Sequence, residues 1–142
     1  MQEALTLARA AAEAGEVPVG ALVVKDGVII GRGANRPIGT HDPTAHAEII
    51  ALREAAAALG TDRLTGSDLW VTLEPCAMCA GAIAHARIAR LYYGASDPKG
   101  GAVEHGPKLF AHPTVHHRPE VYGGICEDEA AALLRAFFEA RR

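Results

Sequence analysis

Two runs of aliphatic and β-branched residues follow each other in the segment VPVGALVVKDGVIIGRGAN, residues 17–35, with the pair Asp26-Gly27 between them. Asp and Gly tolerate the positive φ angles of a type I′ turn, whose twist matches that of two antiparallel strands. The sequence therefore predicts a β-hairpin here, and the chain must adopt a fold that contains a sheet.

Segments with helical periodicity alternate with further strand-like segments along the rest of the chain. Residues 2–14 have helical spacing up to Gly15, and residues 45–60 have it up to Gly60, with Asp42 or Thr44 available to cap the second helix. We also expect a strand over 68–75, a helix over 76–88, a strand over 89–96 and a helix over 127–142. This alternation predicts an α/β fold, a three-layer α/β/α sandwich formed by one domain over residues 1–142.

Residues 98–113 show no clear periodicity and contain Pro98, Gly100 and Gly101. A long irregular loop in a compact domain usually forms a functional surface. The next segment, VHHRPEVYGG, residues 115–124, is weakly strand-like. Because Pro119 cannot donate a hydrogen bond to a neighbouring strand, we expect this segment at a sheet edge.

Charge and hydropathy argue against several classes of protein. The formal net charge is −3, from 14 Lys and Arg against 17 Asp and Glu, so any nucleic-acid site must be a local patch. No apolar run approaches the roughly 20 residues that span a bilayer. The opening MQEALTLARAAAEAGE has an amphipathic helix pattern without the features of a secretory signal. We therefore expect a cytoplasmic protein.

The spacing of the cysteines favours metal or redox chemistry over a disulfide framework. Cys76 and Cys79 are three positions apart, so a helix would point both sulfurs at one metal ion. Pro75 is tolerated at the start of such a helix, where free N–H groups stabilise thiolates. Taken alone, the pair is most often a redox site or half of a structural zinc site. We interpret Cys126 as a small buried hydrophobic residue.

His46 and Glu48 stand at the start of the helix expected over residues 45–60. They would lie about 200° apart around a regular helix, so they can converge only at its first turn. We expect His46 to bind a metal beyond the helix end, with Glu48 held back to carry a proton. The alternative for Glu48 is an ordinary solvated helix residue.

Two thiolates and one neutral imidazole would leave a fourth position on Zn²⁺ for water, whose pKa would fall to about 7. Glu48 would accept a proton and deliver protons to a ring nitrogen and to a leaving amine. This chemistry suits attack on an amidine-like carbon that carries an exocyclic amine. The order H-x-E followed by P-C-x-x-C is the signature of zinc deaminases.

Four segments carry a resemblance to a known family: PTAHAEI at 43–49, VTLEPCAMCAGAI at 71–83, GASDPKGGA at 94–102 and LLRAFFEARR at 133–142. With them the chain resembles the bacterial tRNA-specific adenosine deaminases, which convert the wobble adenosine of a tRNA anticodon to inosine. The resemblance implies a cytidine deaminase-like α/β/α sandwich around a five-stranded mixed sheet, a homodimer, and one zinc per subunit. It makes His46, Cys76 and Cys79 the zinc ligands and Glu48 the catalytic proton carrier.

The resemblance also implies contacts with the anticodon stem-loop. Asn35, Ala47, Asp97 and His112 would bind substrate, with Asn35 on the flipped-out base and Asp97 near a neighbouring sugar. A local rim of cations would bind phosphates: Lys99, Lys108, His112, Arg118, Arg141 and Arg142. Of the adjacent pair Phe137 and Phe138, one would enter the core and the other would offer a stacking surface. Asn35 could instead end a strand, and Asp97 could form a turn before Pro98.

The chain departs from the family pattern at His116-His117-Arg118, where many members have Asn-His-Arg. This departure concerns the RNA side of the molecule and leaves the metal site unchanged. Two alternatives to the tRNA reading remain at this point. One is a deaminase of a free base or nucleoside, such as guanine or cytosine, and the other is a zinc or thiol-redox module without catalytic activity.

Overall fold

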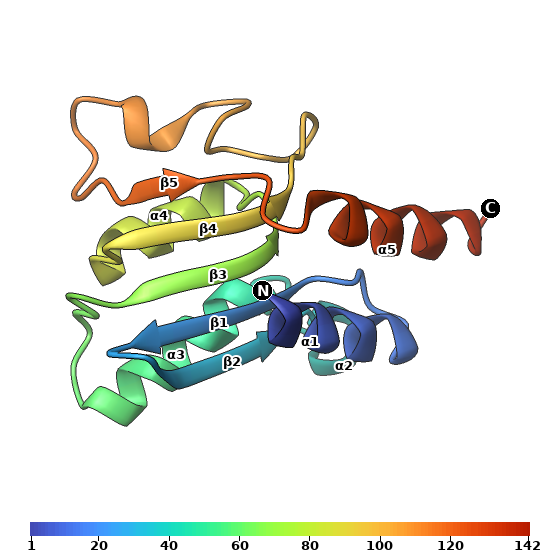
Figure 1. Ribbon diagram of the computed structural model, residues 1–142, viewed down its shortest axis with the longest axis horizontal. Helices are drawn as coiled ribbons and strands as arrows, with labels where there is room; N and C mark the ends of the chain where they lie inside the picture. The colour runs from blue at the N-terminus through green and yellow to red at the C-terminus, as the bar shows by residue number, and fades with distance from the viewer.

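The hairpin forms one side of the sheet in the computed structural model, which describes residues 1–142 (Figure 1). β1 spans Gly20–Lys25 and β2 spans Val28–Ala34. The two strands are antiparallel, and the turn between them has φ angles of 51° at Asp26 and 76° at Gly27. Both residues therefore occupy the left-handed region that the predicted type I′ turn requires.

Five strands form the sheet in the order β2-β1-β3-β4-β5. The other three strands are β3 (Asp68–Leu73), β4 (Arg90–Ala95) and β5 (Glu120–Tyr122). β1 runs antiparallel to β2 and β3, whereas β3, β4 and β5 run parallel. The sheet is therefore mixed. β5 has only three residues and lies at the edge, as predicted from Pro119.

Helices cover both faces of the sheet, which confirms the three-layer α/β/α prediction (Figure 1). α1 (Gln2–Glu13) and α5 (Glu127–Glu139) lie on one face, and α3 (Ala47–Leu59) and α4 (Ala77–Ala86) lie on the other. Two short helical segments were not predicted: α2 (Pro37–Thr40) and a 3-10 turn over Leu109–Ala111. None of the helices combines the length and apolar character needed to cross a membrane.

The main core lies between the sheet and the α3–α4 layer. Leu69, Val71, Leu91 and Tyr93 point into it from the parallel strands, and Ile83 enters from α4. Because successive side chains of a strand point to opposite faces, the intervening residues face the α1–α5 layer. Trp70, Tyr92 and Tyr122 do so and stack on one another across β3, β4 and β5.

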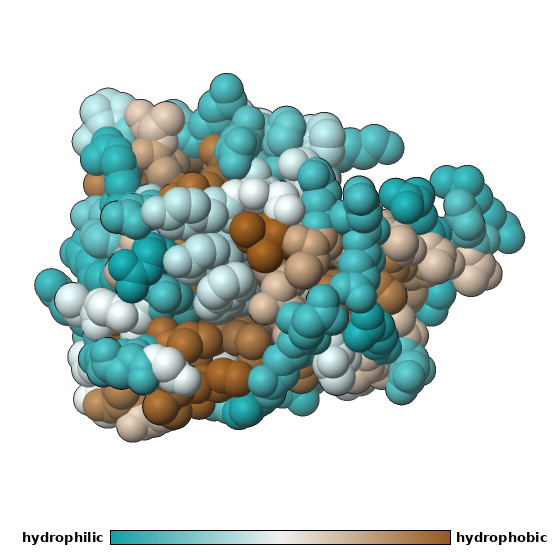
Figure 2. Space-filling view, in the orientation of Figure 1, coloured by the Kyte–Doolittle hydropathy of each residue, from teal (hydrophilic) through white to brown (hydrophobic).

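The helices leave part of the α1–α5 face uncovered. Figure 2 shows a hydrophobic patch over the turn end of the β1–β2 hairpin, where Val28 is 60% exposed. By contrast, the apolar segment from Ala80 to Ile88 around α4 has most of its residues buried. Its Ile83 and Ile88 are fully buried because they pack in the core.

Glycines on β2 let α3 approach the sheet closely. A Cβ atom at Gly33 would lie 2.1 Å from the carbonyl oxygen of Ala47, and one at Gly31 would lie 2.2 Å from that of Ala51. No side chain fits at such distances, so the missing Cβ atoms set the separation between β2 and the first turns of α3. The first of these turns carries the residues of the site.

Candidate metal centre and active site

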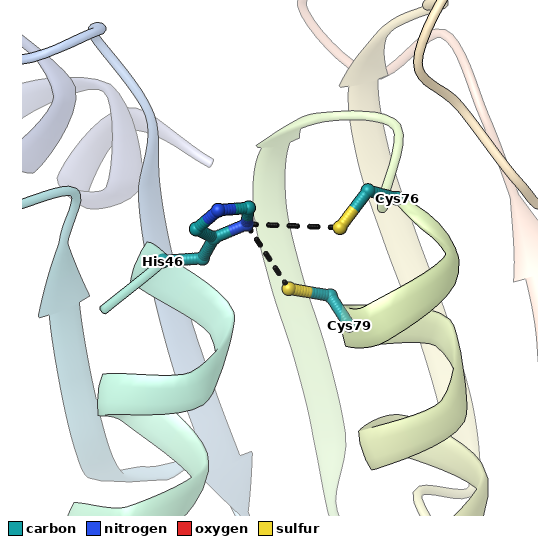
Figure 3. Close-up of side chains that lie close together, drawn as sticks. All are labelled: His46, Cys76 and Cys79. Atoms are coloured by element: carbon teal, nitrogen blue, oxygen red, sulfur yellow. Dashed lines mark hydrogen bonds between the residues drawn. The ribbon is translucent and has the colours of Figure 1, made fainter. Parts of the chain in front are cut away.

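The start of α3 and the start of α4 meet at the predicted metal ligands. His46 is the N-cap of α3 and has extended backbone angles, φ −75° and ψ 152°, so its side chain projects beyond the helix end. Cys76 is the N-cap of α4, and Cys79 lies in the first turn of the same helix. Figure 3 shows the imidazole pointing toward both sulfurs. Residues that are 30 positions apart in the chain thus form one cluster.

The geometry of this cluster fits zinc. Nδ1 of His46 lies 3.6 Å from the sulfur of Cys76 and 3.6 Å from that of Cys79, and all three donor atoms lie within 4.8 Å of one another. Tetrahedral zinc, with Zn–S of about 2.3 Å and Zn–N of about 2.0–2.1 Å, would separate sulfur and nitrogen by about 3.6 Å. The donor set and its spacing therefore fit a three-ligand site that could hold a metal ion such as zinc.

The two thiols differ in acidity. The side chain of Cys79, with a further contribution from His46, lowers the pKa of Cys76 to about 5. The sulfur of Cys76, together with burial and the carboxylate of Glu48, raises the pKa of Cys79 above its ordinary range. Without metal, the pair thus keeps one proton and one negative charge. A divalent cation would stabilise the second thiolate, because metal binding releases the thiol proton.

The helix starts differ from our expectation in two details. Cys76 lies just outside α4, and Pro75 precedes it, so Pro75 is not the first residue of the helix. Neither Asp42 nor Thr44 caps α3. Asp42 instead accepts hydrogen bonds from the backbone N–H and the hydroxyl of Thr44 at 2.9 and 2.7 Å. This local turn competes with capping, as Asp side chains often do.

Asn35 supplies the missing cap. Its side-chain oxygen accepts the N–H of Ala47, the first residue of α3, at 2.8 Å. Asn35 directly follows β2, and its side chain contacts the residue that follows His46. Its amide nitrogen has no protein partner in the structure, and Asn35 is half-buried, so an N–H donor is left for a ligand.

Glu48 is buried beside the cluster, with 4% of its surface exposed. The interpretation as a solvated helix residue is therefore wrong. Burial, with the negative charge of Cys76, raises the pKa of Glu48 to about 7, although a hydrogen bond from the backbone of Glu48 and the charge of His46 act in the opposite direction. A carboxyl group with this pKa can both accept and donate a proton near neutrality, as an acid/base catalyst must.

A second buried carboxylate, Glu74, organises the loop that follows β4. Its Oε1 accepts the N–H of Asp97 at 3.0 Å, and its Oε2 accepts the N–H groups of Val103 at 3.1 Å and Glu104 at 2.9 Å. Burial raises the pKa of Glu74, but these donors outweigh it, so the net pKa lies below the ordinary value. Our sequence reasoning missed Glu74, although its position directly before Pro75-Cys76 is a signal that it shares the site.

Asp97 lies in the turn at the start of this loop. Its Oδ1 accepts the N–H groups of Lys99 at 3.2 Å and Gly100 at 2.9 Å, so Asp97 does form a turn. It also lines a groove of about 870 Å³ between the loop and α5. The groove brings together several residues predicted for RNA contact: Asp97, Lys99, Phe138, Arg141 and Arg142.

The two phenylalanines of α5 divide as predicted. Phe137 is buried, whereas Phe138 is 49% exposed in the groove. Arg141 places its guanidinium carbon 3.5 Å from the centre of the Phe137 ring and donates to the carbonyl of that residue. One end of the groove therefore combines an exposed ring with cations.

Other members of the predicted cation rim lie elsewhere. His112 follows the 3-10 turn and lines a separate pocket of about 270 Å³ with His85 and His116. Arg118 donates to the carbonyls of Phe110 and His112, so its guanidinium already holds this loop together. Lys108 is exposed next to the 3-10 turn and does not line the Asp97 groove. The structure therefore divides the predicted rim between two regions.

Cys126 does not match our interpretation. It is exposed and adopts a left-handed backbone conformation, φ 54°, immediately before α5. The prediction that it is a small buried residue is wrong, because the segment turns sharply at the surface to start the last helix. Its sulfur takes no part in the cluster formed by His46, Cys76 and Cys79.

Comparisons with known proteins place this geometry in a family. The family model of the MafB19-like deaminases matches residues 1–142. A tRNA-specific adenosine deaminase from Agrobacterium fabrum is 58% identical over 142 residues, which are all of this chain and 93% of that protein. A structure from a study of A-to-I editing by tRNA:A34 deaminases at the wobble position has a TM-score of 0.93 and 58% identity, covering 94% of this chain and 97% of that one.

A guanine deaminase from Bacillus subtilis is a more distant match. Its structure has a TM-score of 0.65 and 45% identity, and the match covers 67% of this chain and 61% of that one. A structure from a study of guanine deaminase from Nitrosomonas europaea covers 96% of this chain and 81% of that one, with a TM-score of 0.78 and 30% identity. The tRNA-specific enzymes combine coverage of the whole chain with higher identity. The chain therefore belongs to the MafB19-like deaminase family and, within it, to the tRNA-specific adenosine deaminases.

Proposed function

We propose that this protein hydrolyses the wobble adenosine of a tRNA anticodon to inosine and ammonia, with zinc held by His46, Cys76 and Cys79. The observation that carries the proposal is the meeting of these three side chains beside the buried carboxyl group of Glu48. The full-length similarity to tRNA-specific adenosine deaminases supports the choice of substrate.

Zinc bound by two sulfurs and one nitrogen would act as a Lewis acid that activates water near neutral pH. Glu48 accepts a proton from the attacking water and delivers one to a ring nitrogen of adenine. It then takes the remaining proton of the added hydroxyl group and transfers it to the exocyclic amine, which leaves as ammonia while the C6 carbonyl forms. The balance is adenosine plus water to inosine plus ammonia, and a pKa of about 7 suits a group that takes and returns protons.

Asn35 orients the base in this proposal. Because its side-chain oxygen caps α3, its amide N–H group is the part that donates to an acceptor on the purine edge. Ala47 is fully buried and its N–H donates to Asn35, so we assign Ala47 an indirect contribution through that residue. The free oxygen of Asp97 would accept a hydrogen bond from a ribose 2′-OH.

The groove between the Asp97 loop and α5 would bind the nucleotides that flank the target. Lys99, Arg141 and Arg142 give a cationic lining on a protein with net negative charge, and Phe138 offers a ring face for stacking. Replacing Lys99 and Arg142 by Gln should reduce the dependence of stem-loop affinity on salt, with the slope of log K against log[salt] falling by about 0.7 per lost phosphate contact. Arg63→Gln, on an exposed residue away from the groove, is the control.

We further propose a cytoplasmic homodimer, as the family resemblance implies. A hollow of about 460 Å³ between α3 and α4, lined in part by Ile49, Leu52, Ala56 and Ala82, supports a partner subunit on this side. Light scattering during size-exclusion chromatography measures the mass directly. A monomer at micromolar concentration would contradict the dimer without affecting the chemistry.

A free-base deaminase is the second candidate, and it is less well supported because the guanine deaminases that match are 45% and 30% identical, against 58% for a tRNA-specific adenosine deaminase. The decisive experiment incubates the zinc-loaded protein with an anticodon stem-loop RNA and, separately, with guanine, cytosine and adenosine. We expect inosine, detected by mass spectrometry, only in the stem-loop. Glu48→Ala should abolish turnover with zinc content unchanged, and Cys126→Ser should leave both unchanged. Product from the small molecules alone would overturn the tRNA assignment.

A further inference from the structure

Glu74 is a buried acidic residue that the proposed chemistry does not use. It is 2% exposed and lies at the end of β3, two residues before Cys76. In addition to the N–H groups of Asp97, Val103 and Glu104, it accepts the backbone N–H of His105 at 3.2 Å, and its Oε1 lies 2.7 Å from Nδ1 of the same residue. Because an ionised carboxylate only accepts, Nδ1 carries the hydrogen in this contact.

The loop encloses the carboxylate so closely that no side chain fits between them. A Cβ atom at Gly101 would lie 2.5 Å from the carboxyl carbon of Glu74 and 2.5 Å from the carbonyl oxygen of Asp97. The N–H of Gly101 donates to that same carbonyl at 2.8 Å. The main chain of residues 97–105 therefore wraps around one carboxylate, which receives four backbone N–H groups and one ring N–H.

The same strand end carries the metal-binding segment. Glu74 is joined to Cys76 through Pro75, and the carbonyl of Pro75 accepts the N–H of Ala102 at 2.9 Å. The position of Asp97 relative to Cys76 is therefore fixed by contacts that begin at Glu74. Glu16 holds α2 in a similar way, accepting the N–H groups of Ile38 and Gly39, but neither of these partners lines the groove.

We propose that Glu74 is a positioning residue for the RNA: by gathering the N–H groups of residues 97–105, it holds Asp97 at the distance from Cys76 that lets one substrate reach both. This inference rests on the proposed function. It assigns Glu74 an effect on the binding of nucleotides beside the target, acting through Asp97, with the proton transfers left to Glu48.

Glu74→Gln tests the proposal with little change in shape. An amide keeps one acceptor oxygen but turns an NH₂ group toward N–H donors, so part of the loop must separate from residue 74. We expect hydrogen exchange at residues 97–105 to become at least about tenfold faster, while exchange in α3 is unchanged. Zinc content should equal that of the wild type. Exchange that stays slow throughout the loop would overturn the proposal.

Kinetics separate positioning from a general structural role. For an anticodon stem-loop, KM should rise about tenfold in Glu74→Gln while kcat changes less than about twofold, because the lost interaction concerns binding. In an Asp97→Ala background the same substitution should change KM by less than about twofold, since coupled residues are not additive. Full additivity, or a fall in kcat with unchanged KM, would contradict action through Asp97.

Two further variants keep the test decisive. His105→Ala removes only the ring N–H donor to Glu74, and His105 is half-exposed, so this variant should fold even if Glu74→Gln does not. It should also raise KM, by a smaller factor than Glu74→Gln. Glu54→Gln makes the same charge change on an exposed residue of α3 and should leave KM and exchange unchanged. An unchanged KM in His105→Ala with a faster-exchanging loop would refute the link to RNA.

Binding distinguishes failure of this proposal from failure of the proposed function. Anisotropy of a fluorescent stem-loop is measured with zinc-loaded protein in the Glu48→Ala background, where no turnover occurs. About tenfold weaker binding on adding Glu74→Gln supports the positioning role even if the wild type fails to deaminate the RNA. Equal affinity for both proteins overturns it, even if deamination is confirmed.

Discussion

The side-chain oxygen of Asn35 accepts the first N–H of α3, from Ala47, at 2.8 Å. Asn35, the residue directly after β2, thus caps α3. The residue directly before α3 is His46, a predicted metal ligand. An Asn can use its oxygen and its NH₂ group independently. Helix capping and substrate binding can therefore be separated by mutation at this one position.

Asn35→Asp keeps the cap acceptor and removes the N–H donor, whereas Asn35→Ala removes both. We expect the Ala variant to lose about 1 kcal/mol of stability from the missing cap and the Asp variant to lose less. Both should bind the stem-loop more weakly. Urea unfolding and KM measurements distinguish the two effects. Equal stability of the two variants would show that the cap contributes little.

Gly33→Ala should disturb the site through the contact between β2 and the start of α3. Its Cβ would overlap the carbonyl of Ala47, which forces the start of α3 away from β2 and should cost roughly 1–3 kcal/mol. Because His46 moves with that helix end, zinc affinity should fall as well. Gly27→Ala is the control, since that position has a positive φ but no neighbour within 4 Å. Normal zinc affinity in Gly33→Ala would contradict the expected shift of the helix.

Glu48 should make the stability of the metal-free protein depend on pH. The folded-state pKa of about 7 lies above the ordinary value of 4.5, so the stabilising contribution is fully present below pH 4.5 and is lost as pH rises toward 7. Glu48→Gln cannot ionise. Its stability advantage over the wild type should therefore grow by roughly 2–3 kcal/mol between pH 5 and pH 8. The check is urea unfolding of both proteins without metal, and a constant difference across this range would be inconsistent with a raised pKa.

Removal of zinc should lower thermal stability through mass action. A ligand present at about 1,000 times its Kd stabilises the folded state by roughly 4 kcal/mol, so a chelator should shift the melting temperature of the wild type downward. Cys79→Ser should start from the lower temperature and respond little to the chelator. Cys126→Ser should behave as the wild type, because Cys126 lies outside the cluster. Elemental analysis of each protein accompanies the melts.

Most of the fold could be predicted from local patterns. Asp26-Gly27 specified the hairpin turn, and Gly60 marked the end of α3 with a left-handed φ of 68°. These features depend on residues that are close in the chain, so propensity and periodicity report them directly. The exact helix starts were less accurate. Cys76 caps α4 from outside because its backbone is extended, and no periodic pattern records that choice.

The sequence by itself indicated which residues form the His46, Cys76 and Cys79 cluster, because the spacing of the two cysteines and the pair His46 and Glu48 restrict which chemistry is possible. Only the tertiary structure decided which residues support that chemistry. Glu74 reaches Asp97 across 23 positions in the chain, and the groove joins that loop to α5. Such partners depend on how strands and helices pack, and packing is set by long-range contacts that no local sequence pattern contains.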